Sequence, residues 1–174
     1  SDNYAEMDRS GLLVRDLNGL PLHLAFWDKG TDGQVFMRYY DATSPEARAY
    51  VWEKINAGYG RFGIHAYWLD ACEPEMLADK PGGARYFLGD GAEVQGVYPR
   101  ENARGVYEGL TTGGVDDVVL LCRSAWAGSQ RYGAAVWSGD IDSTFEALAA
   151  QIPAGLNIGI SGIPWWTTDI GGFR

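Results

Sequence analysis

Short apolar runs alternate with helix-like segments along this chain, and that alternation restricts its fold more than any other feature. Runs at residues 64–69, 117–122, 133–137 and 156–162 have the length and composition of strands. The run 117–122 is continuously apolar and rich in β-branched residues, which is typical of a strand covered on both faces. A succession of strand, helix, strand, helix and strand predicts an α/β fold with a parallel sheet and right-handed crossovers.

Two helices are predicted from local start and stop signals. Ser44 is expected to be the N-cap of the first helix, with Pro45 at its first helical position and Gly58 at its exit. The second helix covers residues 101–112 and stops at the glycine pair that follows. Each of these helices precedes a strand-like run, as the alternating pattern requires.

A third helix is predicted after the run 133–137. Ser143 and Glu146 form a capping box at its start, and Pro153 is expected to end it. Its apolar face comprises Phe145, Leu148, Ala149 and Ile152. Residues 74–99 are rich in glycine and proline, so a long loop is expected there.

The N-terminal segment and one connection do not follow the alternating pattern. Residues 2–41 show no clear helical period, and Asn18-Gly19 is expected to form a hairpin turn that leads into a strand at residues 22–27. The connection 123–132 has room for only about one helical turn, whereas a parallel crossover normally needs about a dozen residues or more.

Length and charge limit the classes of protein and partner. A chain of 174 residues fits a single domain, 1–174, with a sizeable core. The net charge of −9 argues against nucleic acid and against an anionic membrane surface, because no basic stripe exists to neutralise phosphates. No apolar run is long enough to span a bilayer, and no signal peptide opens the chain. These features leave the compartment open.

The residues that most often bind metals are few and badly spaced for that purpose. Cys72 and Cys122 lack any metal or redox spacing and are expected to be free, mostly buried thiols. His23 and His65 lack a His-x3-His or comparable pattern, so a metal site that includes them is rejected. No metal is expected.

Ionisable residues follow the strand-like runs. Asp70, Arg123, Asp140 and Asp169 each lie just past such a run. Because loops at the carboxyl ends of parallel strands build the active sites of α/β proteins, these groups are expected to converge on one rim. The alternative is that each is an ordinary loop residue.

Tryptophan is frequent beside these acids, at Trp68, Trp137, Trp165 and Trp166. Aromatic faces pack on the apolar C–H faces of a pyranose while carboxylates accept hydrogen bonds from its hydroxyl groups. The pattern suggests a sugar-binding cleft. Trp165 and Trp166 fit a core position equally well.

Three motifs together carry a resemblance to a known family. "YWLDACEPE", "RSAWAGSQRYGAAVWSGD" and "SGIPWWTTDIGGF" occur in this order, and the chain resembles glycoside hydrolase family 31 over essentially its whole length. That family contains retaining α-glucosidases and α-xylosidases. The forms "WLDACEPE" and "AGSQRYGAAVWSGDI" are most similar to its α-xylosidase-type branch. The resemblance implies a parallel (β/α) barrel of the TIM type, here a partial barrel with about five or six of its eight strands.

The resemblance also implies a role for each motif residue. Asp70 matches the catalytic nucleophile and Asp140 the general acid/base of a double-displacement mechanism that needs no cofactor. The residues matching contacts to the sugar in the −1 subsite are Arg123, Trp137 and Asp169, those matching aromatic walls are Trp68 and Phe173, and Glu73 matches a supporting acid. The implied substrate is an α-linked oligosaccharide or xyloside.

Each of these residues also has a purely structural interpretation. Asp70 could make a turn or N-cap contact, Asp140 could belong to turn chemistry before a helix, and Arg123 could form a structural ion pair with Asp70. Asp169 could fix a loop. Glu73 is better described as a structural hydrogen-bond acceptor than as a catalyst.

The chain departs from the family pattern in its extent. A closed barrel needs eight strands and typically ~250 residues. The family's early-strand aspartate and late-strand histidine have no counterpart here. An open barrel leaves edge strands uncovered, so the chain is expected to be part of a larger enzyme, to self-associate as a homo-oligomer, or to cover its edges otherwise. The alternative functions are a catalytically incomplete carbohydrate-binding or self-assembling fragment, or an α/β protein of another function.

Overall fold

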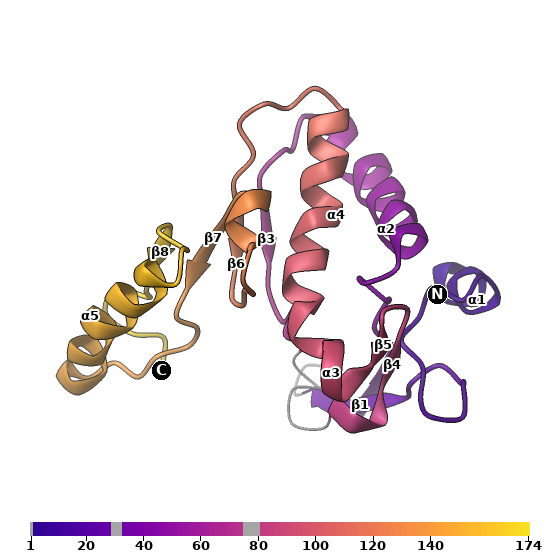
Figure 1. Ribbon diagram of the computed structural model, residues 1–174, viewed down its shortest axis with the longest axis horizontal. Coiled ribbons are helices and arrows are strands. Elements are labelled where there is room, and N and C mark those ends of the chain that lie inside the picture. Colours follow the sequence, from indigo (N-terminus) through magenta and orange to yellow (C-terminus); the bar gives the residue numbers. More distant parts are fainter. Residues whose placement is uncertain (1, 29–32, 75–80) are drawn as a thin grey trace.

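The centre of the molecule is a parallel sheet of short strands. The structure is a computed structural model and describes residues 2–28, 33–74 and 81–174 (Figure 1). Within these residues the sheet has four strands in the order β3-β6-β7-β8, and all neighbouring pairs are parallel. The strands are β3 (Tyr67–Leu69), β6 (Leu120–Cys122), β7 (Ala134–Trp137) and β8 (Trp166–Thr167).

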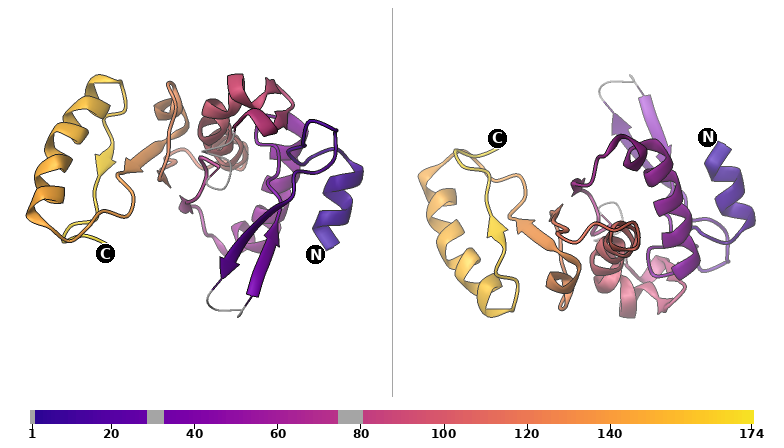
Figure 2. Two further views of the ribbon diagram at one scale, coloured as in Figure 1. Left: turned by 90° about the horizontal axis from the view of Figure 1, so that it is seen from below. Right: turned by 90° about the horizontal axis from the view of Figure 1, so that it is seen from above.

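Three longer helices accompany the sheet. Helices α2 (Pro45–Gly58) and α4 (Tyr98–Thr112) lie side by side, and α5 (Phe145–Ile160) follows β7 at the C-terminal end of the molecule (Figures 1 and 2). The shorter elements are α1 (Asp2–Arg9), β1 (Leu24–Asp28), β2 (Gly33–Met37), η1 (Gly60–Phe62), η3 (Pro81–Gly83), β4 (Arg85–Tyr86), β5 (Gly89–Asp90), α3 (Gly91–Val94), η4 (Gln95–Val97) and η5 (Ser129–Tyr132).

The core lies between the sheet and helices α2 and α4. Its buried members from α4, β6 and β7 include Ala103, Val106, Leu110, Leu120, Cys122 and Ala134. Tyr67 and Leu69 of β3 pack against the same cluster. Since successive strand residues point to opposite faces, Trp68, Leu121 and Trp137 lie on the other face, away from these helices. The helices therefore cover only one face of the sheet.

The expected fold class is confirmed, but the number of strands in the parallel sheet is smaller than the five or six expected. Residues 156–162, predicted as a strand, lie in the end of α5 and the turn after it. The predicted stop at Pro153 is wrong, because Pro153 sits inside the helix. A proline removes one backbone hydrogen bond, and Leu156 and Ile160 continue the helical spacing of Ile152 beyond it. The N-cap is Thr144 rather than Ser143.

The other local predictions have mixed outcomes. The helix after Ser44 is confirmed, and Ser44 Oγ accepts from the Ala47 N–H. Helix α1 was missed, because an eight-residue helix is too short to establish a period. Residues 74–99 were predicted as a loop, yet outside 75–80, which are not described, they contain several short elements. The short connection after β6 nonetheless joins parallel neighbours through η5.

The turn predicted at the N-terminus is present. Gly19 has a φ of +80°, and the Asp16 carboxylate accepts hydrogen bonds from the backbone N–H groups of Asn18 and Leu20. The strand after it, β1, begins at Leu24 and pairs with β2 in an antiparallel hairpin outside the parallel sheet. No helix among the described residues combines the length and apolar character needed to cross a membrane.

The contact between α2 and α4 depends on a glycine. A Cβ atom at Gly109 would lie 2.1 Å from the indole of Trp52. We expect Gly109→Ala to destabilise the protein by about 1–3 kcal/mol, because the partly buried Trp52 ring, which packs against the core, has to shift. Gly58→Ala is the matched control, since nothing lies within 4 Å of its Cβ position. Urea denaturation of both variants checks this, and equal stabilities would contradict it.

Candidate active site

Asp70 stands at the carboxyl end of β3 in a tight backbone turn. The next residue, Ala71, has a φ of +55°, which few non-glycine residues adopt. The Ala71 N–H donates to Asp70 Oδ1, with an N···O distance of 2.8 Å. The carboxylate of Asp70 is about half exposed, at 48%. Asp70 therefore presents a carboxylate to solvent with one oxygen held by its own turn.

Arg123 stands at the end of the neighbouring strand. Leu69 pairs with Cys122 in the parallel register, so the residues that follow them emerge side by side. The Arg123 guanidinium lies 3.2 Å from Asp70 Oδ1. Its Nε and the NH2 nitrogen also donate to Glu73, at 3.1 and 3.0 Å. One arginine thus connects two acids of the same loop. The ion pair between Arg123 and Asp70, which the sequence offered as the structural alternative, is present.

Glu73 accepts both of these hydrogen bonds in a partly buried position. Burial by itself raises the pKa of the Glu73 carboxyl, but hydrogen bonds from Arg123 and from backbone N–H, with the positive charge of Arg123, outweigh it and lower that pKa on balance. Glu73 is therefore an ionised anchor for Arg123 at neutral pH.

This anchor predicts a pH-dependent stability. The folded-state pKa of Glu73 is depressed, so its contribution is present above the unfolded pKa and is lost as the pH falls through the folded value. We expect Glu73→Gln to lower the free energy of unfolding by about 2 kcal/mol at pH 7, the scale of a hydrogen bond to a charged group. In urea titrations the deficit should shrink as the pH falls below the ordinary pKa range of a glutamate. Glu93→Gln, at an exposed position, should show no such trend.

Two tryptophans pack together on the face of the sheet that the helices leave open. The rings of Trp68 and Trp137 are edge to face, with centroids 5.6 Å apart and an interplanar angle of 78°. Trp68 is 66% exposed, whereas Trp137 is 5% exposed. The pair therefore offers one accessible indole on a fixed base, an arrangement suited to packing against a sugar ring.

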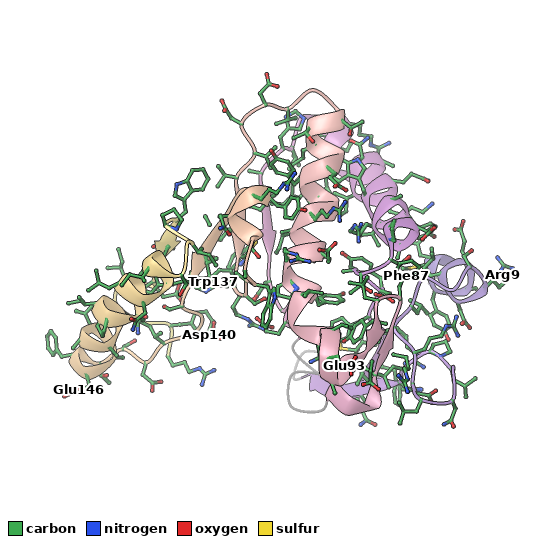
Figure 3. The ribbon with its side chains drawn as sticks, in the orientation of Figure 1. Arg9, Phe87, Glu93, Trp137, Asp140 and Glu146 are labelled. Carbon is green, nitrogen blue, oxygen red and sulfur yellow. The ribbon has the colours of Figure 1, made fainter. Side chains whose placement is uncertain are left out.

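Asp140 follows β7 on the segment that leads into α5, as Figure 3 shows. Its carboxylate lies 3.9 Å from the guanidinium of Arg174 at the C-terminal end. The N–H of Phe173 donates to the carbonyl of Ile141 at 2.8 Å, which ties the C-terminal segment to this loop. The Phe173 side chain is largely exposed.

Asp169 follows β8 and lies near the start of α5. Its main-chain carbonyl accepts from the Gly172 N–H at 2.9 Å. It lines a hollow of about 270 Å³ together with Thr144 and Leu148. Beside it, the hydroxyl groups of Ser138 and Thr168 are 3.0 Å apart, which connects the ends of β7 and β8.

The carboxyl ends of four neighbouring strands thus carry the residues singled out in the sequence. Ion pairs join Asp70, Glu73 and Arg123, while Asp140 and Asp169 lie on the loops after β7 and β8. Arg123 and Trp137 share a hollow of about 480 Å³. A larger hollow, about 600 Å³, lies between α2 and α4 and contains none of the residues predicted for the site. Their catalytic and binding roles stay predictions.

Other candidate ligands do not assemble. Among the described residues, no group of three or more His, Cys, Asp or Glu side chains is placed to hold a metal ion. His23 instead contacts Arg38, with 2.7 Å between Nδ1 and the guanidinium. Both cysteines are free thiols, Cys122 buried and Cys72 partly buried.

A parallel β/α sheet with acids, an arginine and paired tryptophans at its carboxyl ends is the arrangement of a (β/α)-barrel catalytic domain. The family model described as "Glycosyl hydrolases family 31 TIM-barrel domain" matches residues 1–174. The chain belongs to glycoside hydrolase family 31.

Individual relatives agree with this assignment. The chain is 44% identical over 171 residues to an uncharacterized family 31 glucosidase, ORF2, of Pseudescherichia vulneris, covering 98% of this chain and 31% of that protein. It is 45% identical over 137 residues to an α-xylosidase of Saccharolobus solfataricus, covering 74% of this chain and 18% of that protein. The crystal structure of a family 31 α-xylosidase from a soil metagenome, complexed with xylose, superposes with a TM-score of 0.90 at 49% identity, covering 100% of this chain and 25% of that one. The chain spans less than a third of each of these proteins.

Some residues around the site had no sequence signal. Asn102 stands among charged residues of α4, between Glu101 and Arg104, and Arg174 follows a glycine-rich segment. The contacts of Arg174 with Asp140 and of Asn102 with Cys72 follow from tertiary packing. No local pattern distinguishes either residue.

Proposed function

We propose that the full-length protein is a retaining α-glycoside hydrolase that uses Asp70 as nucleophile and Asp140 as general acid/base. The observation that carries the proposal is the position of the Asp70 carboxylate. It stands half exposed at the carboxyl end of β3, and its Oδ1 is held by the Ala71 N–H at 2.8 Å and by the Arg123 guanidinium at 3.2 Å, so Oδ2 is left to act as a nucleophile. Membership of a glycosidase family supports the same reaction.

The proposed reaction has two displacements. Asp70 Oδ2 attacks the anomeric carbon while Asp140 donates its proton to the departing glycosidic oxygen, which breaks the glycosidic bond and forms a glycosyl ester on Asp70. Asp140, now a carboxylate, takes a proton from water as that water attacks the same carbon and releases Asp70. Arg123 stays hydrogen-bonded to Glu73 and so keeps its charge beside the nucleophile throughout.

For the substrate we propose an α-xyloside, with an α-glucoside as the competing choice. Two of the relatives described above are α-xylosidases. We assign the exposed indole of Trp68, with Trp137 packed beneath it, as a wall for the sugar ring. Asp169 and Phe173 would contact the sugar from the loop after β8. The chemistry runs on the two carboxylates and calls for no cofactor.

Product stereochemistry tests this proposal. The full-length protein is incubated with an aryl α-xyloside, and the first-formed sugar is followed by proton NMR before it mutarotates. A retaining mechanism releases α-xylose first. Release of β-xylose first, or no hydrolysis of either aryl α-xyloside or aryl α-glucoside, would overturn the proposal.

A second candidate is a carbohydrate-binding or self-assembling chain without turnover, acting as a fragment of a (β/α)8 catalytic domain. One observation favours it: α5 exposes an apolar stripe of Phe145, Leu148, Ile152, Leu156 and Ile160. Edge strands β3 and β8 also end the sheet on both sides. A second copy of the chain is then the partner proposed for these surfaces. Sedimentation velocity of the 174-residue chain tests this. A concentration of about 50 μM lies above the micromolar Kd values of specific contacts. A chain that is still a monomer at that concentration would reject self-association.

A further inference from the structure

Behind the Asp70 turn runs a chain of hydrogen bonds that the proposed reaction does not use. The Cys72 thiol donates to the main-chain carbonyl of Asp70, with 3.0 Å between the atoms. Asn102 Nδ2, from α4, donates to Cys72 Sγ at 3.1 Å. The Tyr40 hydroxyl donates to Asn102 Oδ1. The residues of this chain lie far apart in the sequence and meet only behind the turn.

Each group in this series of hydrogen bonds can be assigned as donor or acceptor. Asn102 is only 7% exposed, and the Tyr40 hydroxyl on its oxygen leaves the amide NH2 group to face Cys72. The Tyr98 hydroxyl donates to the Tyr40 carbonyl at 2.9 Å, which holds Tyr40 in place. Cys72 can donate to Asp70 only as a protonated thiol, and burial raises its pKa to about 12. At neutral pH every link of the chain is therefore satisfied.

The Asp70 carbonyl is the point where this chain meets the strained turn. Ala71, at φ +55°, is in a left-handed conformation that costs a non-glycine residue about 1–2 kcal/mol. The Cys72–Asp70 hydrogen bond spans that residue and closes the turn. The same turn aims the Ala71 N–H at the Asp70 carboxylate. Loss of the thiol would leave the turn free to relax, and the carboxylate would move with it.

We propose that Asn102, acting through the Cys72 thiol, is a positioning residue that holds the Asp70 carboxylate in the geometry for attack. This inference rests on the proposed role of Asp70 as nucleophile. Arg123 restrains the carboxylate from the neighbouring strand, and the Asn102–Cys72 chain restrains its backbone from the helix side. Misplacing a reacting group by about 1 Å can lower the rate by about 10²-fold. Loss of the Asn102–Cys72 restraint is therefore expected to lower kcat.

Two substitutions of Cys72 isolate the hydrogen bond from the packing. Cys72→Ser keeps a donor and an acceptor on the same Cβ atom, whereas Cys72→Ala removes both. In the full-length protein, Cys72→Ala is expected to lower kcat for an aryl α-xyloside by about 10- to 100-fold with little change in KM. Cys72→Ser is expected to retain kcat within about threefold of the wild type. Partial rescue by serine is a result that a purely packing role would not produce.

Asn102→Leu tests the next link. Leucine fills a similar volume without donating, so its kcat is expected to fall as in Cys72→Ala. Combined with Cys72→Ala, it should add little, because residues that act in one chain are not additive. Cys122→Ala is the matched control, since Cys122 is a buried thiol whose Sγ lies 3.6 Å from the Leu120 carbonyl of its own strand, not on the Asp70 turn. Its kcat should stay at the wild-type value.

The outcomes separate this inference from the proposed function. Wild-type kcat in Cys72→Ala, or an equal loss in Cys72→Ser and Cys72→Ala, would overturn the positioning role while Asp70→Ala stays inactive. An active Asp70→Ala would instead remove the nucleophile on which the inference rests. Thermal unfolding of each variant reports folding, and the Cys72 pair decides the question even if Asn102→Leu does not fold.

Discussion

Asp70→Ala in the full-length protein is expected to lower kcat for an aryl α-xyloside by at least about 10⁴-fold, the scale seen when a catalytic nucleophile is removed. The reason is that the proposed glycosyl ester forms on the carboxylate that this substitution removes. The positive charge of Arg123 and the Ala71 N–H, which now hold the carboxylate, would face an empty space. Steady-state kinetics with matched thermal unfolding curves measure the effect.

Azide distinguishes a missing nucleophile from a disrupted fold. In Asp70→Ala, an external azide ion can attack the anomeric carbon from the side that the carboxylate vacated, and the product is a β-glycosyl azide. Asp16→Ala is the control, because the Asp16 carboxylate likewise holds backbone N–H groups of its own turn but lies in the N-terminal hairpin. Asp16→Ala should keep the wild-type kcat. A comparable loss in both variants would argue against a chemical role for Asp70.

Asp140→Ala is expected to lower kcat by about 10²- to 10⁴-fold for a substrate with a poor leaving group, the range for loss of a general acid or base. The loss should shrink for leaving groups that need no protonation. Rates across a series of aryl α-xylosides whose leaving groups differ in basicity measure the effect.

Azide again provides the diagnostic product for Asp140. In Asp140→Ala the glycosyl ester still forms on Asp70, and azide, which needs no general base, attacks it to give an α-glycosyl azide, opposite in configuration to the Asp70→Ala product. Asp142→Ala is the neighbouring control, because the Asp142 main-chain carbonyl, which accepts from the Thr144 N–H at 2.9 Å, stays in place in the variant. Activity that persists in both Asp70→Ala and Asp140→Ala would overturn the hydrolase proposal.

Elements with local signals were predictable from the sequence. Helix α2 follows from Ser44 and Pro45, which supply an N-cap oxygen and a fixed backbone angle without help from distant residues. The end of α4 at Thr112 follows from the glycine pair after it. Helix α5 was predicted too short, because a proline stop signal was given more weight than the apolar spacing that continues to Ile160.

Contacts within the candidate site were predictable only where strand order determined them. Asp70 and Arg123 follow strands that pair in parallel, and their ion pair follows from that adjacency. The double contact of Arg123 with Glu73 depends on how the loop after β3 folds back. The link from Asn102 to Cys72 depends on where α4 docks against that loop. No local sequence pattern predicts either of these two contacts.

By itself the sequence determined helices α2 and α4, the strands β3, β6 and β7, the parallel character of the sheet and the family of the chain, but not α1 or β8. These properties depend on residues near one another in the chain, or on motifs whose order is preserved. Only the tertiary structure decided that the helices leave the face bearing Trp68 open, and that a buried amide stands behind the turn of Asp70. Such features depend on how α4 and the sheet pack, and packing is set by the summed contacts of the whole core.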